Sequence, residues 1–184
     1  KTTFALTAAQ KLIDRDEIRK IIVVVPTSHL RRQWAKSAAK FGIQLDPNFI
    51  NKNEKVAKDF DGVAVTYATV AMQPLLWRKI ATTHPTLVIL DEVHHAGEAE
   101  HLTWGPALKE AFEVAARRLL LSGTPFRSDR KAIPFVRYDA EGKAIPNYNY
   151  DYGTALMDRE VVRPIAFPAL KGQVSYREAG ATVT

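Results

Sequence analysis

The chain has 184 residues, of which 46% are hydrophobic and 25% charged, a composition that suits one globular domain. It contains no cysteine, which excludes disulfide bonds and cysteine-ligated zinc, and no apolar run approaches the roughly 20 residues of a transmembrane helix. The net charge of +6 favours polyanionic partners, and without a visible secretory signal we expect a cytoplasmic protein with no membrane partner.

The first segment, from Thr2 to about Asp14, is predicted to be a helix packed on a sheet, because its surface is mostly apolar. Lys1 and Thr2 have the order of the last two residues in a phosphate-binding loop, G-x-x-x-x-G-K-[ST]. The chain begins at Lys1 rather than at Met, so we expect it to start inside that loop. The N-terminus of the helix would attract anions through its backbone N–H groups and dipole.

Short apolar segments rich in β-branched residues then alternate with helical patterns, which predicts an α/β fold. We expect a mainly parallel sheet with helices on both faces. The predicted strands are 21–25, 63–66, 86–90 and 117–121; the predicted helices are about 29–41, one from 67 onward, and 104–115; 46–61 is predicted to be a loop, with room for a short helix.

Two adjacent carboxylates, Asp91 and Glu92, follow the strand predicted for 86–90. They would lie at the carboxyl end of that strand, where open α/β sheets bind their ligands. Because unpaired charge is costly to desolvate, a divalent cation would stabilise them there. One carboxylate could hold Mg²⁺ while the other orients or deprotonates a water. The alternative is a solvated acidic turn.

Hydroxyl side chains follow two of the other predicted strands. Thr27 and Ser28 come after 21–25, and Thr66 and Thr69 come at the end of 63–66. Hydroxyls and backbone amides at a helix N-terminus suit contact with nucleic-acid phosphates. The same residue types also cap helices, and the sequence leaves both readings open.

A third pair of hydroxyls, Ser122 and Thr124, ends the strand predicted for 117–121. We expect these hydroxyls to lie beside Asp91-Glu92-Val93-His94 at the carboxyl edge of the sheet. A plain strand and turn is the alternative.

In this order and spacing, the motifs resemble those of the first RecA-like motor domain of superfamily 2 helicases, a P-loop NTPase fold. The nearest group is that of type III restriction subunits and DNA repair helicases. Asp91-Glu92-Val93-His94 resembles the DExH form of the Walker B motif of the DEAD/DEAH-box proteins, and Lys1-Thr2 resembles the end of the Walker A motif. Ser122-Gly123-Thr124-Pro125 resembles the S/T-A/G-T-P motif. Two segments resemble nucleic-acid motifs: Pro26-Thr27-Ser28 is similar to motif Ia, and Thr66-Tyr67-Ala68-Thr69 is similar to the motif that follows it.

The resemblance implies that the chain binds ATP and Mg²⁺. Lys1 would contact the β- and γ-phosphates, and Thr2 and Asp91 would hold Mg²⁺. Glu92 would position the attacking water and accept its proton, with Lys1 and Asp91 as the other catalytic residues. His94 would sense the nucleotide.

The resemblance also implies partners for the other motifs. The nucleic-acid contacts would be Thr27, Ser28, Thr66 and Thr69, and the residues coupling nucleotide state to nucleic-acid binding would be Ser122 and Thr124. A second RecA-like domain of the same protein would close over the nucleotide. We therefore expect the 184 residues alone to hydrolyse ATP very slowly.

The implied function is that of an ATP-dependent DNA helicase or translocase. The alternatives are an ATPase of a restriction or remodelling system that does not separate strands, an RNA helicase, and a binding module that keeps only the fold. RNA stays open because contacts in this family go mainly to the backbone. The intact Asp91-Glu92 pair argues against a non-catalytic module.

The character of the sequence changes near Ile133, so we assign 1–132 to the motor domain, 133–170 to a hairpin and linker, and 171–184 to a disordered tail. The hairpin is predicted for 135–138 and 144–152 around a glycine turn. A short helix is predicted for 154–158 and a strand for 161–168. Several tyrosines in this region could stack on bases, although strand packing is the simpler role.

Overall fold

The computed structural model describes residues 1–95, 104–124, 132–158, 161–165, 176–178 and 181–183. The chain divides into two units, Lys1–Ile145 and Pro146–Thr184, and each is described by itself. No helix in the described ranges is long and apolar enough to cross a bilayer.

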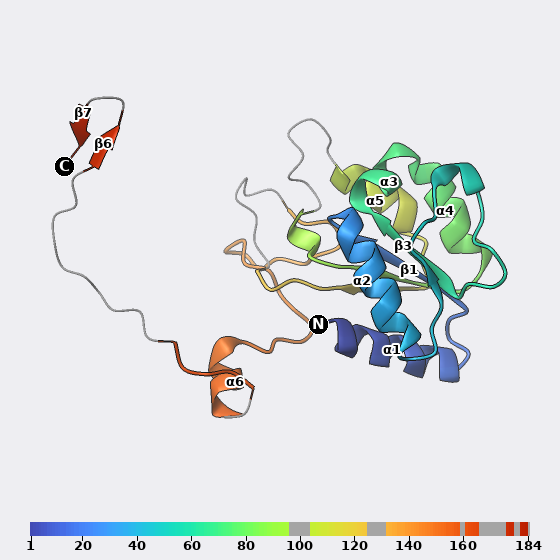
Figure 1. Cartoon of the computed structure of the whole chain (residues 1–184), viewed down its shortest axis with the longest axis horizontal. Coiled ribbons are helices and arrows are strands. Elements are labelled where there is room, and N and C mark those ends of the chain that lie inside the picture. Colours follow the sequence, from blue (N-terminus) through green and yellow to red (C-terminus); the bar gives the residue numbers. More distant parts are fainter. Residues whose placement is uncertain (96–103, 125–131, 159–160, 166–175, 179–180, 184) are drawn as a thin grey trace. The chain divides into compact units, whose positions relative to one another are not determined.

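The first unit is built on a five-stranded sheet in which every neighbouring pair is parallel. The strand order is β2-β3-β1-β4-β5, so β1 lies at the centre (Figure 1). The strands are β1 (Lys20–Val25), β2 (Leu45–Asp46), β3 (Gly62–Thr66), β4 (Thr86–Leu90) and β5 (Arg117–Leu120). The predicted α/β fold with a parallel sheet is confirmed.

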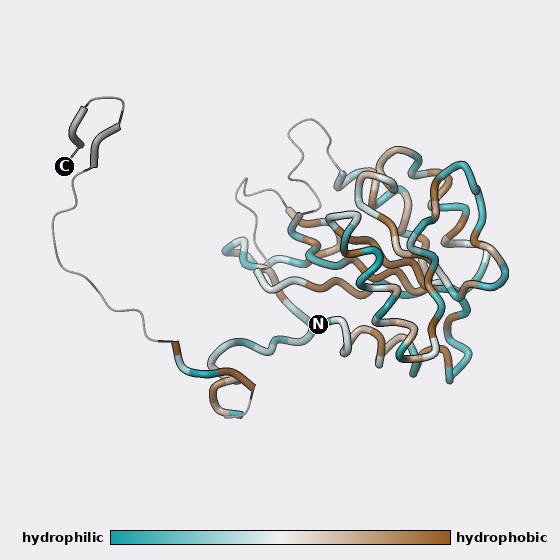
Figure 2. Tube along the Cα trace, viewed as in Figure 1, coloured by the Kyte–Doolittle hydropathy of each residue, from teal (hydrophilic) through white to brown (hydrophobic). Residues whose placement is uncertain are grey.

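Helices cover both faces of this sheet, also as predicted. One core joins α1 and α2 to the sheet, and a second core joins α3, α4 and α5 to the opposite face. Figure 2 shows the apolar strands between these two layers. The helices are α1 (Thr2–Asp14), α2 (Ser28–Ala39), α3 (Tyr67–Met72), α4 (Pro74–Thr83) and α5 (Trp104–Phe112).

The pairing of β1 with β3 depends on a glycine. Gly62 lies opposite Ile21, and a Cβ atom on Gly62 would come within 1.8 Å of the Ile21 carbonyl oxygen. Real side chains do not approach a backbone oxygen this closely, so only glycine fits without moving the strands apart. The register then brings Val25 opposite Thr66, so the carboxyl ends of β1 and β3 lie side by side.

Two predicted elements differ in detail. The single helix expected from Tyr67 onward is two helices, because Pro74 starts α4 and Gln73 before it has an extended φ of −147°. The segment 46–61, expected to be a loop with room for a short helix, does contain the short 3-10 helix η1 (Asn51–Asn53), and the difference is that its first residue belongs to β2.

The glycine turn predicted after residue 138 is present but small. Gly142 has a φ of +79°, and the flanking chain forms one antiparallel bridge, between Tyr138 and Ala144. The Tyr138 hydroxyl also accepts a hydrogen bond from the backbone N–H of buried Ile133, at 2.8 Å. The turn belongs to the first unit, Lys1–Ile145.

The second unit departs further from the sequence-based expectation. Its helix α6 (Tyr152–Met157) begins earlier than predicted, because the Asp151 side chain caps it by accepting from the Thr154 N–H at 2.8 Å. Residues 161–165 form no strand, and 166–168 lie outside the described residues. The tail expected to be disordered contains the paired strands β6 (Tyr176–Glu178) and β7 (Ala181–Val183).

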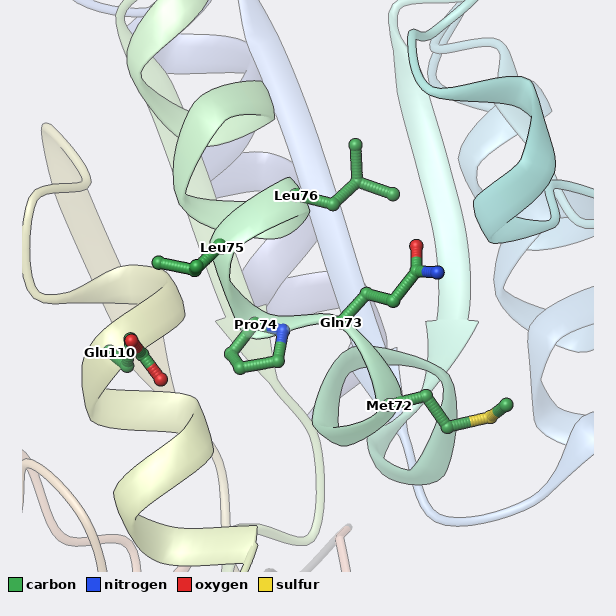
Figure 3. A pocket seen from close by; sticks show the side chains of 6 residues that line it. All are labelled: Met72, Gln73, Pro74, Leu75, Leu76 and Glu110. Atoms are coloured by element: carbon green, nitrogen blue, oxygen red, sulfur yellow. The ribbon is translucent and has the colours of Figure 1, made fainter.

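A shallow pocket of about 430 Å³ lies where α3 gives way to α4 (Figure 3). The exposed side chains of Met72 and Leu75 contribute to it, together with Glu110 of α5. None of the candidate site residues lines it.

Candidate nucleotide site at the carboxyl edge of the sheet

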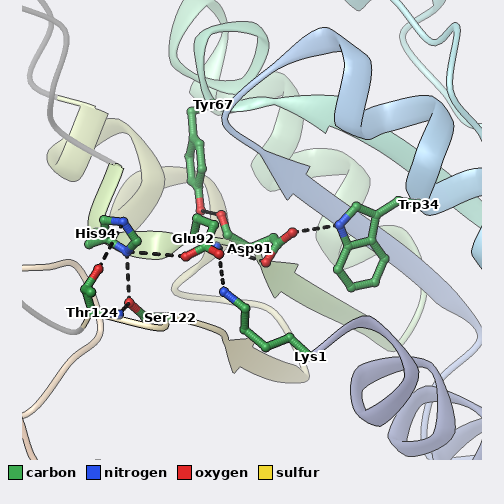
Figure 4. Close-up of polar contacts among 8 residues, drawn as sticks. All are labelled: Lys1, Trp34, Tyr67, Asp91, Glu92, His94, Ser122 and Thr124. Atoms are coloured by element: carbon green, nitrogen blue, oxygen red, sulfur yellow. Dashed lines mark hydrogen bonds and ion pairs between the residues drawn. The ribbon is translucent and has the colours of Figure 1, made fainter. Parts of the chain in front are cut away.

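The sequence directly after β4 forms the centre of the candidate site. Glu92 is ion-paired with the ammonium of Lys1, which precedes α1 (Figure 4). Glu92 also has a φ of +47°, in the left-handed region that residues other than glycine rarely adopt. Backbone strain of this kind concentrates at functional sites. At this position it interrupts the alternation of side chains between the two faces of the sheet that holds along β4. The backbone geometry thus brings together residues 91 positions apart.

The surroundings of Glu92 favour its ionised form. Partial burial raises the pKa of its carboxyl, but the hydrogen bond and charge of Lys1 outweigh this. The charge of His94 and the backbone N–H of Gly123 act in the same direction, so the pKa of Glu92 is lowered from its ordinary value of 4.5. Glu92 is therefore a carboxylate at neutral pH.

Asp91 is held from both faces of the sheet. The indole Nε1–H of Trp34, in α2, donates to its Oδ2 at 2.8 Å, and the hydroxyl of Tyr67, in α3, donates to its backbone carbonyl at 2.8 Å. Neither contact with Asp91 was predicted from the sequence. A general chemical rule was the signal that could have found these contacts, since a buried indole N–H or phenol O–H needs a hydrogen-bond partner.

The Asp91 carboxylate fits a divalent cation. Asp91 is only 8% exposed, and its oxygens accept from two neutral donors, Trp34 Nε1 and Glu92 N. Among the described residues, no Lys, Arg or His forms an ion pair with it. A buried carboxylate without a counter-charge is costly, and Mg²⁺, which prefers oxygen ligands, would balance it.

His94 joins the acidic turn to the end of β5. Its Nδ1 lies 2.8 Å from Ser122 Oγ and 3.6 Å from Glu92 Oε2, and its Nε2 lies 3.4 Å from Thr124 Oγ1. The Thr124 backbone N–H donates to Ser122 Oγ at 3.1 Å. The backbone N–H of Val93 donates to the Leu121 carbonyl at 3.0 Å, so the chain after β4 and the chain after β5 are also joined by a backbone hydrogen bond. The expected proximity of these residues is observed; Pro125 of the same motif lies outside the described residues.

The hydroxyls expected to contact nucleic acid lie at the neighbouring strand ends. Thr66 caps α3, since its hydroxyl accepts from Thr69 N at 3.2 Å and lies 2.9 Å from Thr69 Oγ1. Thr27 occupies the cap position of α2 but makes no side-chain cap bond, and both Thr27 and Ser28 are exposed. The capping alternative is thus observed at Thr66 and not at Thr27.

The site residues predicted from the sequence do not all lie in one cluster. Lys1, Glu92, His94, Ser122 and Thr124 form one network of hydrogen bonds and ion pairs. Thr2 follows Lys1 as the first residue of α1. The nucleic-acid candidates at the ends of β1 and β3 belong to the same edge of the sheet, since β1 pairs with β4, but not to this network.

Comparison with known proteins identifies the family of the chain and its relatives. The family model described as type III restriction enzyme, res subunit, matches residues 1–127. The uncharacterized protein Rv2917 of Mycobacterium tuberculosis is 48% identical over 183 residues, which cover 97% of this chain and 30% of that protein. The uncharacterized protein ML1624 of Mycobacterium leprae is 46% identical with the same coverage. The chain therefore spans 30% of the length of these curated relatives.

A solved structure has the same fold. The Sulfolobus solfataricus SWI2/SNF2 ATPase core in complex with dsDNA aligns with a TM-score of 0.53 and 19% sequence identity, covering 68% of this chain and 25% of that one. The family match covers most of the chain, and the likeness to the SWI2/SNF2 ATPase core concerns the fold. The chain therefore belongs to the family of the type III restriction enzyme res subunit, and its parallel α/β sheet has the RecA-like fold shared with that ATPase core.

Proposed function

We propose that this chain is the ATP-hydrolysing motor domain of a DNA helicase or translocase. One observation carries the proposal: Lys1 at the start of α1 and Glu92 at the end of β4 meet in an ion pair, with His94 within 3.6 Å of the same carboxylate. A cation, a carboxylate and a nearly buried second carboxylate at a strand end are the groups that phosphoryl transfer requires.

In this proposal, Glu92 orients the attacking water and accepts its proton. Lys1 pairs with the Glu92 carboxylate when no nucleotide is bound and with the phosphates of ATP when ATP is bound. When Lys1 contacts phosphate, Glu92 loses the main group that lowers its pKa. Its pKa then rises, which makes Glu92 a stronger base at the moment when substrate is bound.

Asp91 and Thr2 are the proposed ligands of Mg²⁺. The metal ion would neutralise phosphate charge as it develops in the reaction. The chain's own contribution is to hold the Asp91 carboxylate in a fixed direction and to keep it out of bulk water.

The nucleic-acid contacts in this proposal go to the phosphate backbone. Thr27 and Ser28 are exposed at the N-terminus of α2, where backbone N–H groups favour anions. Thr66 and Thr69 would contribute from the adjacent strand end. Such contacts position a strand without reading its sequence, so DNA is the proposed substrate on the strength of the family, and RNA is the alternative.

A second candidate function follows from the matched family itself, whose name is that of a restriction subunit. In such a system the ATPase would move on or remodel DNA without separating its strands. A second RecA-like domain of the same protein would complete the ATP site in either case.

The experiment is ATP hydrolysis by the full-length protein with no nucleic acid, with duplex DNA, with single-stranded DNA and with RNA, alongside a strand-displacement assay. We expect hydrolysis to be stimulated by DNA. Stimulation without displacement would favour the translocating or remodelling ATPase, and stronger stimulation by RNA would favour an RNA helicase. Hydrolysis that ignores all nucleic acids would contradict the motor assignment.

A further inference from the structure

Two aromatic side chains donate hydrogen bonds to Asp91. Trp34 reaches it from the α1 and α2 face of the sheet, and Tyr67 reaches it from the face covered by α3, α4 and α5. Both aromatic residues are buried, Trp34 to 2% exposure and Tyr67 to 0%. Neither touches the network of Lys1, Glu92 and His94 through a described side-chain hydrogen bond.

The two bonds fix different parts of the residue. The indole of Trp34 holds Oδ2 of the carboxylate, whereas the phenol of Tyr67 holds the backbone carbonyl (Figure 4). Oδ1 accepts from Glu92 N at 3.1 Å, which leaves the remaining lone pairs of the carboxylate for a ligand. Rotation of Asp91 about its side-chain bonds would break the bond to Trp34.

The chemistry of the donors matters as much as their position. A lysine or arginine at this place would neutralise the carboxylate and compete with a metal ion. The indole and phenol are neutral, so they orient Asp91 and preserve its charge. Groups that orient a metal ligand in this way tune metal affinity.

We infer that Trp34 and Tyr67 are positioning residues, which set the direction of the Asp91 carboxylate for the Mg²⁺ of the nucleotide complex. This inference rests on the proposed function, since it concerns the same site. Neither residue contacts the reacting atoms. Both act through Asp91, and Trp34 has the larger effect because it bonds the carboxylate itself.

The test measures binding rather than turnover. The affinity of the full-length protein for a fluorescent ADP analogue is measured over a range of Mg²⁺ concentrations. Trp34→Phe should raise the Mg²⁺ concentration for half-maximal binding about tenfold, as expected when an outer-shell partner is lost. Tyr67→Phe, which removes only a hydroxyl, should raise it about threefold.

Matched controls separate positioning from general stability. Trp77→Phe removes a buried indole that bonds Asn51 and Thr69 but not Asp91. Tyr138→Phe removes a phenol that bonds the backbone of Ile133. Both should leave the Mg²⁺ dependence unchanged even if they lower the melting temperature.

A spectroscopic measurement on the unmodified protein gives an independent readout. In protein labelled with ¹⁵N at the tryptophan indoles, the Nε1–H signal of Trp34 should shift when ADP and MgCl₂ are added, and that of Trp77 should not. Variants that lose one indole assign the signals of the three tryptophans in the 184 residues, and Trp77→Phe together with Trp104→Phe identifies the Trp34 signal by elimination if Trp34→Phe does not fold.

An unchanged Mg²⁺ requirement in folded Tyr67→Phe and Trp34→Phe would overturn the inference, as would a Trp34 signal that does not respond to Mg²⁺ and ADP. The proposed function can stand in either case, because wild-type binding of nucleotide would still depend on Mg²⁺. If the wild type itself shows no Mg²⁺-dependent nucleotide binding, the proposed function fails and this inference fails with it.

Discussion

Ser122 Oγ lies 2.8 Å from Nδ1 of His94, so the end of β5 is hydrogen-bonded to the turn that carries the acidic pair. The same imidazole nitrogen lies 3.6 Å from Glu92 Oε2. A shift of the β5 end would therefore reach the Glu92 carboxylate through one side chain. Through this contact, Ser122 could couple ATP hydrolysis at Glu92 to movement on nucleic acid, as the sequence analysis expects of Ser122 and Thr124.

The first prediction concerns that route. Replacing both Ser122 and Thr124 with Ala removes the hydroxyls that bond His94 but little volume, so the fold should survive. In the full-length protein, ATP binding should stay near normal and hydrolysis should fall no more than about threefold, while strand displacement or translocation falls about tenfold. Parallel ATPase and displacement assays measure both.

A matched control is the double variant Thr82→Ala and Thr83→Ala, since these hydroxyls bond only backbone carbonyls of α4. It should behave as wild type in both assays. Equal losses of hydrolysis and movement in the Ser122 and Thr124 variant would mean that the turn only supports the active site.

The second prediction distinguishes phosphate contact from capping. Thr66→Ala should lower the free energy of unfolding by about 1 kcal/mol, because it removes the cap of α3. Thr27→Ala should leave stability nearly unchanged, because its side chain makes no cap bond, and should weaken DNA binding. Urea unfolding and fluorescence anisotropy measure the two effects.

The anisotropy assay also tests how DNA is read. Binding should weaken steeply between two salt concentrations and vary little among unrelated duplexes, because phosphate contacts dominate. Strong preference for one sequence, or binding that ignores salt, would count against a backbone-reading surface.

The third prediction concerns the sheet that carries the site. Gly62→Ala would place a Cβ within 1.8 Å of the Ile21 carbonyl oxygen and should cost at least about 2 kcal/mol of stability through strand displacement. Gly105→Ala, in α5, meets only Pro134 Cγ at 3.4 Å and should be neutral or slightly stabilising. Thermal unfolding compares the two; equal stability of the two variants would refute the close approach.

The fourth prediction follows from the lowered pKa of Glu92. Because its folded-state pKa lies below 4.5, ionised Glu92 contributes stability that is fully present above pH 4.5 and is lost as the pH falls through the folded value. The difference in unfolding free energy between wild type and Glu92→Gln should therefore shrink on acidification below that pH. Melting curves from pH 7 to pH 3 provide the measurement, and a gap that does not vary with pH would contradict the pairing with Lys1.

Much of the fold could be predicted from the sequence because its signals are local. The β-branched run ending at Val25 and the apolar run ending at Leu90 specify buried strands by themselves, and Asp91 and Glu92 then fall at a strand end. The helix break at Pro74 was also visible in principle, since proline lacks an N–H, but the prediction from residue 67 onward ran through it.

The remaining features depend on contacts between distant residues. Trp34 and Asp91 are 57 positions apart, and only the folded sheet brings the indole to the carboxylate. The left-handed backbone of Glu92 has no sequence signal, because glutamate does not favour it. The two-residue strand β2 is defined by its pairing with β3 rather than by its own composition.

The most direct test of the proposed motor function is the comparison of wild type and Glu92→Gln in the full-length protein. The substitution keeps the size of the side chain and removes the base, so nucleotide affinity should stay within about threefold while the rate of ATP hydrolysis falls at least about 100-fold. Binding is measured with a fluorescent nucleotide and turnover by phosphate release with saturating DNA. Hydrolysis within a few-fold of wild type would show that Glu92 is not the catalytic carboxylate and would contradict the proposed mechanism.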